Sequence, residues 1–241
     1  VKAILEFMNI SSGLEIHHDG DLPARTGLGS SSSFAVGLLH SIYALKGVMP
    51  SKLRLATEAI HVEQNLIREN VGSQDQVSAA FGGFNVISFN PDDTIKVSPV
   101  ILSIDKLNQL KHHIMFYFTG FSRIASEIAK KQIEDTPKKK KELAVMGEMV
   151  NEALSILSSG QTDIAEFGKL LHESWQLKRS LTDKISTSQI DGIYEEARRA
   201  GAIGGKLLGA GGGGFMIIFA RPEDQPAIAD RLRVFLRVPF G

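Results

Sequence analysis

The sequence predicts an α+β fold, because strand-like and helix-like segments alternate irregularly and hairpins occur beside crossover connections. Apolar residues recur at helical spacing in several long segments, whereas shorter segments alternate or are continuously apolar, as in strands. A length of 241 residues allows one large domain or two small ones. The composition changes over residues 102–111, and we therefore expect one domain over 1–104 and a second over 105–241.

In the first half of the chain, helices are expected where apolar residues recur every three to four positions. Residues 2–9 fit a helix or a strand. Gly47 can end one helix, and Ser51 can cap the start of the next. The expected elements are a strand at 14–18, helices from Ser30 to Gly47 and from Ser51 to about Asn70, a short helix ending at Gly82, and hairpin strands at 84–89 and 95–102.

The second half is expected to be helical around a few apolar strands. Four lysines at 138–141 are interpreted as a solvated helix face rather than a phosphate or nucleic-acid patch, because the chain carries no net charge. The expected elements are strands at 113–118, 203–208 and 215–219, and helices from about Arg123, at 142–158, 163–181 and 188–200, and after Pro222.

Composition excludes several classes of protein. Hydrophobic residues make up 43% and charged residues 22%, as in soluble globular proteins, and no apolar run is long enough to cross a membrane. Lys plus Arg and Asp plus Glu each number 27, so nothing favours a nucleic-acid partner. The chain has no cysteine and no signal-like segment at residues 1–10. We therefore expect a cytoplasmic protein, as the simplest location.

A stretch rich in glycine and serine precedes the helix that begins near Ser30, and it reads Asp21-Leu-Pro-Ala-Arg-Thr-Gly-Leu-Gly-Ser-Ser-Ser-Ser33. Glycines permit tight turns and close approach to a ligand, and the first turn of a helix presents N–H groups to an anion. The stretch therefore suits a phosphate, and serine hydroxyls could complete a magnesium shell. A flexible turn followed by a helix cap fits the same residues.

Two carboxylates could serve such a site. Asp75 follows the small residues Gly72 and Ser73, and it could accept the proton of a substrate hydroxyl or orient that hydroxyl. Glu63 lies on the preceding expected helix, and one carboxylate with one serine hydroxyl and phosphate oxygens is an adequate set of magnesium ligands. The alternatives are that Asp75 caps the helix after it and that Glu63 is a surface residue.

A second glycine-rich loop, Gly209-Ala-Gly-Gly-Gly-Gly214, separates two strongly apolar segments. Since a tight hairpin turn needs at most two glycines, this run indicates a backbone that passes very near another group. That group could be a nucleotide or the first glycine loop. A flexible hairpin is the alternative, although it suits the flanking apolar strands poorly.

These stretches resemble the GHMP kinases, the family of galactokinase and of homoserine, mevalonate and phosphomevalonate kinases. The stretch at 21–33 resembles the central phosphate-binding motif, and Lys206-Leu-Leu-Gly-Ala-Gly-Gly-Gly-Gly-Phe215 resembles the C-terminal glycine motif. Within the family, four segments look most like the D-glycero-D-manno-heptose 7-phosphate kinases: Gly72-Ser-Gln-Asp-Gln76, Phe81-Gly-Gly-Phe84, Phe118-Thr-Gly-Phe-Ser-Arg123 and Leu171-His-Glu-Ser-Trp175.

The resemblance implies a two-domain fold with the site between the domains. The N-terminal domain should resemble ribosomal protein S5 domain 2, and the C-terminal domain should be ferredoxin-like. Family members carry an N-terminal motif and strands ahead of the segment that begins here, so we expect a truncated first domain, and we expect Gly241 to precede the usual last strand.

The resemblance also implies roles for individual residues. Asp75 corresponds to the catalytic aspartate, Glu63 to the magnesium-binding glutamate and Ser31 to the magnesium-binding serine. The residues implied to bind the phosphates of ATP are Gly27, Leu28, Gly29, Ser30, Ser31, Ser32 and Ser33.

The implied activity is phosphoryl transfer from ATP, with Mg²⁺, to the anomeric hydroxyl of D-glycero-D-manno-heptose 7-phosphate, giving the 1,7-bisphosphate. The candidates for substrate binding are Arg123, Gly211 and Gly212. Arg123 is a candidate because its guanidinium group can bind a sugar phosphate. Arg123 could equally be a plain surface residue. His172 and Trp175 could line the sugar site, although a tryptophan at helical spacing from Leu171 and Leu177 is more often a core residue.

Several alternatives remain at this point. Another sugar-1-kinase such as a fucokinase, a mevalonate-type kinase, and a non-catalytic sensor of sugar and ATP would all use the same motifs. We expect a small-molecule substrate, neither a nucleic-acid nor a membrane partner, and a possible homodimer.

Overall fold

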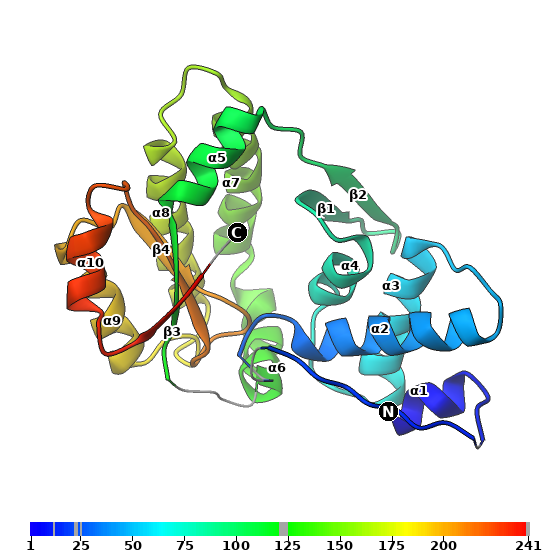
Figure 1. Cartoon of the computed structure of the whole chain (residues 1–241). Coiled ribbons are helices and arrows are strands. Elements are labelled where there is room, and N and C mark those ends of the chain that lie inside the picture. Colours follow the sequence, from blue (N-terminus) through cyan, green and yellow to red (C-terminus); the bar gives the residue numbers. More distant parts are fainter. Residues whose placement is uncertain (12, 22–23, 25, 121–124, 240–241) are drawn as a thin grey trace. The chain divides into compact units, whose positions relative to one another are not determined.

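The computed structural model describes residues 1–241 except 12, 22–23, 25, 121–124 and 240–241, and the chain forms two compact units. The first unit comprises residues 1–25 and 29–100, and the second comprises 26–28 and 101–241. The predicted boundary followed residue 104, and the structural division follows Val100. Helices and antiparallel sheets occur together, which confirms the α+β class (Figure 1).

Helices packed on the long α2 make up most of the first unit. Leu39 and Ile42 of α2 are almost fully buried against Ile4 of α1 and Leu55 of α3, and these contacts form its core. The described elements of this unit are α1 (Lys2–Phe7), α2 (Ser30–Leu45), α3 (Lys52–His61), the π-helical turn Val62–Leu66, α4 (Gln74–Phe81), β1 (Asn85–Phe89) and β2 (Ile95–Pro99).

Local signals in the sequence predicted most of these boundaries. Gly47, just after α2, has a φ of +68°, as expected of a glycine that ends a helix. The Ser51 hydroxyl accepts the N–H of Arg54 (3.1 Å) and caps α3. Strands β1 and β2 pair antiparallel as the predicted hairpin, and residues 2–9, which fitted either type, contain the helix α1.

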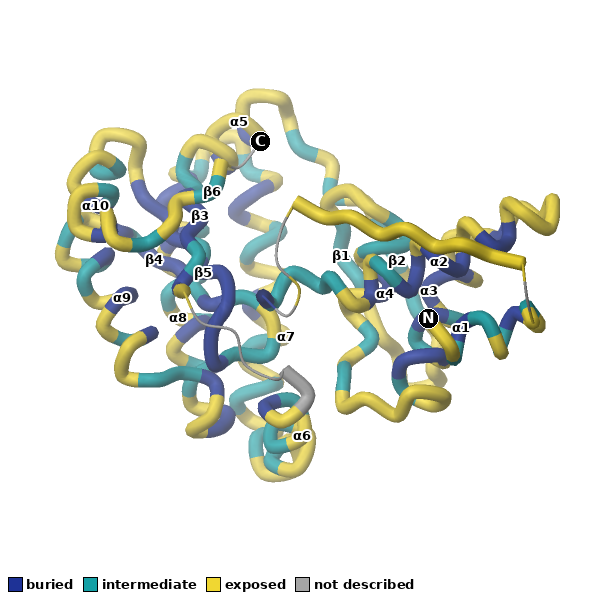
Figure 2. Tube along the Cα trace, turned by 60° about the horizontal axis from the view of Figure 1, so that its bottom comes forward, coloured by how far each residue is buried: buried dark blue, intermediate teal, exposed yellow. Residues whose placement is uncertain are grey.

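The predicted strand at 14–18 is wrong. This segment forms no regular structure, and Leu14 and Ile16 remain 40% and 36% exposed. Figure 2 shows it in the exposed colour. Alternating residues are necessary for a half-buried strand but not sufficient, because a strand also needs a neighbour to pair with, and no described strand pairs here.

A four-stranded antiparallel sheet organises the second unit, with the strand order β4-β5-β3-β6. Along the chain, β3 is followed by helices, the hairpin β4-β5, α10 and β6, and this arrangement matches the predicted ferredoxin-like domain. The elements are α5 (Ile104–His113), β3 (Ile114–Phe118), α6 (Ala125–Asp135), a 3₁₀ turn (Thr136–Lys138), α7 (Lys140–Ser158), α8 (Ala165–Leu181), α9 (Ser188–Arg199), β4 (Gly204–Leu207), β5 (Phe215–Phe219), α10 (Gln225–Arg231) and β6 (Leu236–Val238).

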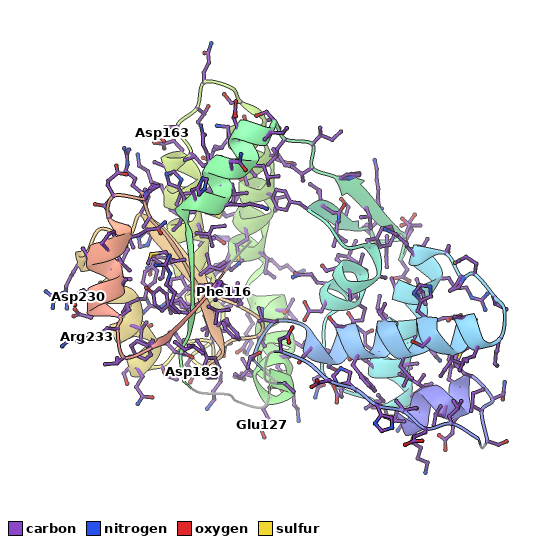
Figure 3. All side chains as sticks on the ribbon, in the orientation of Figure 1. Phe116, Glu127, Asp163, Asp183, Asp230 and Arg233 are labelled. Carbon is purple, nitrogen blue, oxygen red and sulfur yellow. The ribbon has the colours of Figure 1, made fainter. Side chains whose placement is uncertain are left out.

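The sheet is buried on both faces, which explains the continuous apolar sequence of β3 and β5. Met115 and Tyr117 of β3 belong to one core cluster with α9 and α10, whereas Ile114 packs with Phe219 in a cluster that includes residues of α5, α7 and α8. Phe116 stacks on Phe215 with ring centroids 4.8 Å apart, and Figure 3 labels Phe116 on its strand.

Two elements of this unit escaped prediction. Helix α5, capped by the Ser103 hydroxyl, lies where only a change in composition had been noted, and β6 pairs with β3 near the end of the chain. The lysines at 138, 140 and 141 are exposed, as the solvated interpretation required. Among the described residues, no helix combines the length and apolarity needed to cross a bilayer.

We predict that Gly204→Ala strongly destabilises the second unit. A Cβ at this position would lie 1.9 Å from the carbonyl oxygen of Gly168, so α8 would have to move away from β4. We expect a loss of about 3 kcal/mol in the free energy of unfolding, measured with urea. Gly192→Ala is the matched control, because no described atom outside its own helix backbone lies within 4 Å of its Cβ position on α9. It should gain up to about 1 kcal/mol, and equal stability of the two variants would contradict the packing argument.

Candidate active site

Glu63 is the buried centre of a polar cluster in the first unit. It lies in the π-helical turn that continues α3, a form often found at functional sites, and it is 1% exposed. Its interpretation as a surface residue is therefore wrong. A buried carboxylate needs donors, and three side chains provide them. Ser31 Oγ donates to Oε1, Ser32 Oγ donates to Oε2 (2.8 Å) and Gln76 Nε2 donates to Oε2 (2.5 Å).

The two serines differ in how ligands can reach them. Ser31 is exposed, whereas Ser32 is 5% exposed, because successive residues of a helix point in different directions. The accessible hydroxyl thus contacts one carboxylate oxygen of Glu63, and the buried hydroxyl contacts the other. The structure therefore brings the two predicted magnesium ligands, Ser31 and Glu63, into direct contact. Hydroxyl and carboxylate oxygens are also the ligands that Mg²⁺ prefers.

Asp75 lies beside the start of α2. A Cβ built on Gly29 would be 3.3 Å from both Cβ and Cγ of Asp75, so the absence of a side chain at position 29 makes room for this carboxyl group. The first residue of α4 is Gln74 and its N-cap is Ser73. The alternative interpretation, that Asp75 caps this helix, is therefore wrong. Asp75 lies within the first turn of α4.

The start of α2 has the features of an anion site. Its N-cap is Gly29, which has a left-handed φ of +67° and, as a glycine, carries no side chain that could cap the helix. The first backbone bond of the helix runs from the Ser33 N–H to the Gly29 oxygen (2.8 Å). The N–H groups of a first turn and the helix dipole attract phosphate, so this turn can bind a negatively charged ligand.

The second glycine loop packs against Thr26–Leu28 within the second unit. A Cβ at Gly209 would lie 2.6 Å from Cα of Gly27, and one at Gly214 would lie 2.1 Å from the Thr26 oxygen. That oxygen also accepts the N–H of Phe215 (3.1 Å). The prediction that this backbone passes very near another group is confirmed, and the group is the first glycine loop.

Three further residues fix the second loop. The Thr119 hydroxyl donates to the Gly214 oxygen (2.8 Å), and the Gly212 N–H donates to the Ile185 oxygen (2.9 Å). The buried Lys178 on α8 donates from Nζ to the Gly209 oxygen (2.6 Å). The loop is consequently held on several sides, and the interpretation as a flexible hairpin is wrong.

Sequence reasoning missed several of these contacts. Gln76 directly follows Asp75, but nothing in the sequence distinguishes a buried amide from a solvated one. Lys178 occupies a helix that also carries the exposed charged residues Glu166, Lys169 and Glu173, so its contact with the loop could not be predicted from the sequence pattern. Arg123, predicted to bind substrate, lies outside the described residues.

Trp175 belongs to the core, and His172 lies half-buried against Tyr194. Trp175 is fully buried, and His172 Nδ1 lies 2.7 Å from the hydroxyl of Tyr194. Burial lowers the pKa of His172, with a further contribution from Arg198, and burial raises the pKa of Tyr194 to about 12. Neutral forms are therefore favoured at this pair, as suits a structural contact.

Both halves of the chain match models of one family. Residues 1–83 match the GHMP kinases N terminal domain, and residues 143–237 match the GHMP kinases C terminal domain. The chain belongs to the GHMP kinase family. The predicted resemblance is thereby confirmed.

The relatives of this GHMP kinase differ in their acceptors. The D-glycero-alpha-D-manno-heptose 7-phosphate kinase of Campylobacter jejuni is 28% identical over 96% of this chain and 68% of that protein. A mevalonate kinase of Pyrococcus horikoshii is 27% identical over 100% of this chain and 69% of that protein. The crystal structure of a D-glycero-D-manno-heptose 1-phosphate kinase from Bacteroides thetaiotaomicron has a TM-score of 0.64 and 26% identity, over 91% of this chain and 62% of that one. This chain thus spans about two thirds of their lengths.

We predict that Gly29→Ala displaces Asp75. Alanine is disfavoured at a φ of +67°, and its Cβ would press on the Asp75 side chain. Gly47→Ala is the matched control, because Gly47 has a φ of +68° and, apart from its chain neighbours, no described atom lies within 4 Å of its Cβ position. Both variants should lose about 1 kcal/mol of stability in urea. Crystal structures should show Asp75 displaced in the first variant alone, and an unmoved Asp75 in both would contradict the contact.

Proposed function

We propose that this GHMP kinase is an ATP- and magnesium-dependent sugar kinase. It would phosphorylate the anomeric hydroxyl of D-glycero-D-manno-heptose 7-phosphate and yield the 1,7-bisphosphate. The observation that carries the proposal is the contact of buried Glu63 with the Ser31 hydroxyl at the start of α2, with Asp75 beside the N-cap of the same helix. Carboxylate, hydroxyl and helix N-terminus are the groups that phosphoryl transfer requires.

The glycine- and serine-rich loop would bind the nucleotide. N–H groups at 27–33 suit the phosphates of ATP, and the glycines allow the backbone to approach them closely. Glu63 and Ser31 would hold Mg²⁺, which when bound neutralises charge on the transferring phosphoryl group. Ser32, which is buried, would instead keep the Glu63 carboxylate in place.

Asp75 would act on the acceptor. Its carboxylate is exposed, and it can therefore accept the proton of the sugar C1 hydroxyl. As that oxygen bonds to the γ-phosphorus, the bond from the γ-phosphorus to the bridging oxygen breaks, and ADP leaves with the electron pair. The proton passes from Asp75 to solvent. Gly29, without a side chain, leaves the space next to this carboxylate open.

The choice of acceptor is supported by similarity rather than by geometry. Enzymes named for heptose phosphates are among the relatives, at 28% and 26% identity. Arg123 would hold the 7-phosphate, and Gly211 and Gly212 would contact the substrate. A mevalonate kinase is the second candidate, because the Pyrococcus relative is 27% identical over 100% of this chain.

A panel of acceptors tests the assignment. ADP formation should be measured with heptose 7-phosphate, the unphosphorylated heptose, fucose, galactose and mevalonate, and ³¹P NMR should detect an anomeric phosphate in the product. We expect turnover with heptose 7-phosphate to exceed all others. Exclusive turnover of an unphosphorylated sugar or of mevalonate would overturn the substrate, and nucleotide binding without any turnover would favour a sensor.

We predict that Asp75→Asn lowers kcat by about 10²–10⁴-fold, because the acceptor proton loses its base. ATP affinity should change by less than about twofold, since the amide keeps the shape of the side chain and the phosphate-binding loop is untouched. Asp105→Asn is the matched control, because Asp105 is the second residue of α5 as Asp75 is of α4. Unchanged kcat in the first variant would refute the role of Asp75.

A further inference from the structure

Gln76 is a buried polar residue that the proposed mechanism leaves without a role. Its side chain is 1% exposed, and Nε2 donates to Oε2 of Glu63 (2.5 Å). The same oxygen accepts the Ser32 hydroxyl (2.8 Å), whereas Oε1 accepts the exposed Ser31. Two buried donors thus hold one oxygen of the carboxylate, and the other oxygen faces the accessible hydroxyl.

The orientation of the Gln76 amide follows from its neighbour. A carboxylate accepts hydrogen bonds and cannot donate them, so the NH₂ group must face Glu63. The carbonyl oxygen Oε1 of Gln76 is then buried, with no partner among the described residues. An unsatisfied buried oxygen is unfavourable, and an apolar side chain would avoid it. The hydrogen bond from Nε2 to Glu63 is therefore the contact that explains why position 76 carries an amide side chain.

The first turn of α4 contacts the cluster at two successive positions. Asp75 lies against Gly29, the N-cap of α2, and Gln76 contacts Glu63 in the π-helical turn. Both contacts lie within the first unit. The position of one short helical turn consequently fixes the proposed base and the proposed metal ligand relative to each other.

We propose that Gln76 is a positioning residue for divalent-cation binding. It holds Oε2 of Glu63 inward, so that Oε1 and the Ser31 hydroxyl are presented together to the cation. The inference rests on the proposed function, because the cation is the one that accompanies ATP. Gln76 itself contacts neither substrate nor cation in this assignment.

The test is the variant Gln76→Met, which has a similar length but lacks the amide donor. Binding of Mn²⁺ in the presence of adenylyl imidodiphosphate should be followed by electron paramagnetic resonance. We expect cation affinity to fall about 10–100-fold, as when groups that orient a metal ligand are removed. The Mg²⁺ concentration for half-maximal rate should rise in parallel, while the KM of the sugar stays within about twofold.

Tyr43→Phe is the matched control. The Tyr43 hydroxyl donates to the carboxylate of Glu58 (2.8 Å) in the same unit, away from the cluster. Loss of this hydroxyl should lower the stability of the protein but leave Mn²⁺ affinity unaltered. In a Glu63→Gln background, Gln76→Met should produce no further loss of affinity, because both changes act through the same contact.

The outcomes separate this inference from the proposed function. Mn²⁺ affinity in Gln76→Met equal to that of the wild type would overturn the positioning role, whatever the acceptor proves to be. Reduced Mn²⁺ affinity in a protein that phosphorylates none of the acceptors would support the positioning role of Gln76 and reject the proposed sugar kinase activity. Should Gln76→Met fail to fold, Gln76→Asn, whose amide is one methylene too short to reach Glu63, carries the same expectations.

Discussion

The buried carboxylate of Glu63 is the constraint on which the first unit depends. A carboxylate removed from water is unfavourable unless donors surround it, and its donors come from two other elements, α2 and α4. The start of each helix must therefore reach the π-helical turn that carries Glu63. This requirement explains why a serine run and an amide occur at these two helix starts, and why Asp75 is held next to the N-cap of α2.

Close backbone packing is the corresponding constraint in the second unit. Gly27, Gly209 and Gly214 each occupy a place where a Cβ would come within 3 Å of another backbone atom. Lys178 adds a buried cation that binds a loop carbonyl. The glycines of this loop thus permit close contact, and the loop's own hydrogen bonds limit the freedom that glycine would otherwise give.

Features encoded by near neighbours could be predicted from the sequence, and features encoded by distant partners could not. The cap at Ser51 depends on a residue three positions away and was predicted correctly. The segment at 14–18 has the pattern of a strand but no described strand to pair with, and α5 has few apolar residues to reveal its period. At the site, Glu63 was predicted to bind magnesium, yet its burial and its contact with Gln76 depend on packing between separate helices.

The asymmetry of the Glu63 carboxylate links stability to function. Two buried donors, Ser32 and Gln76, hold Oε2, and these bonds can persist whether or not a ligand is present. The exposed Ser31 donates to Oε1. Oε1 is therefore the carboxylate oxygen that can exchange its hydrogen bond for a contact with a cation. Ordering a side chain on binding costs about 0.5–1.5 kcal/mol, and here folding has already ordered Ser31 and Glu63 beside each other. The fold thus bears the cost of burying the carboxylate, and a cation that binds at Oε1 meets ligands that need little further rearrangement.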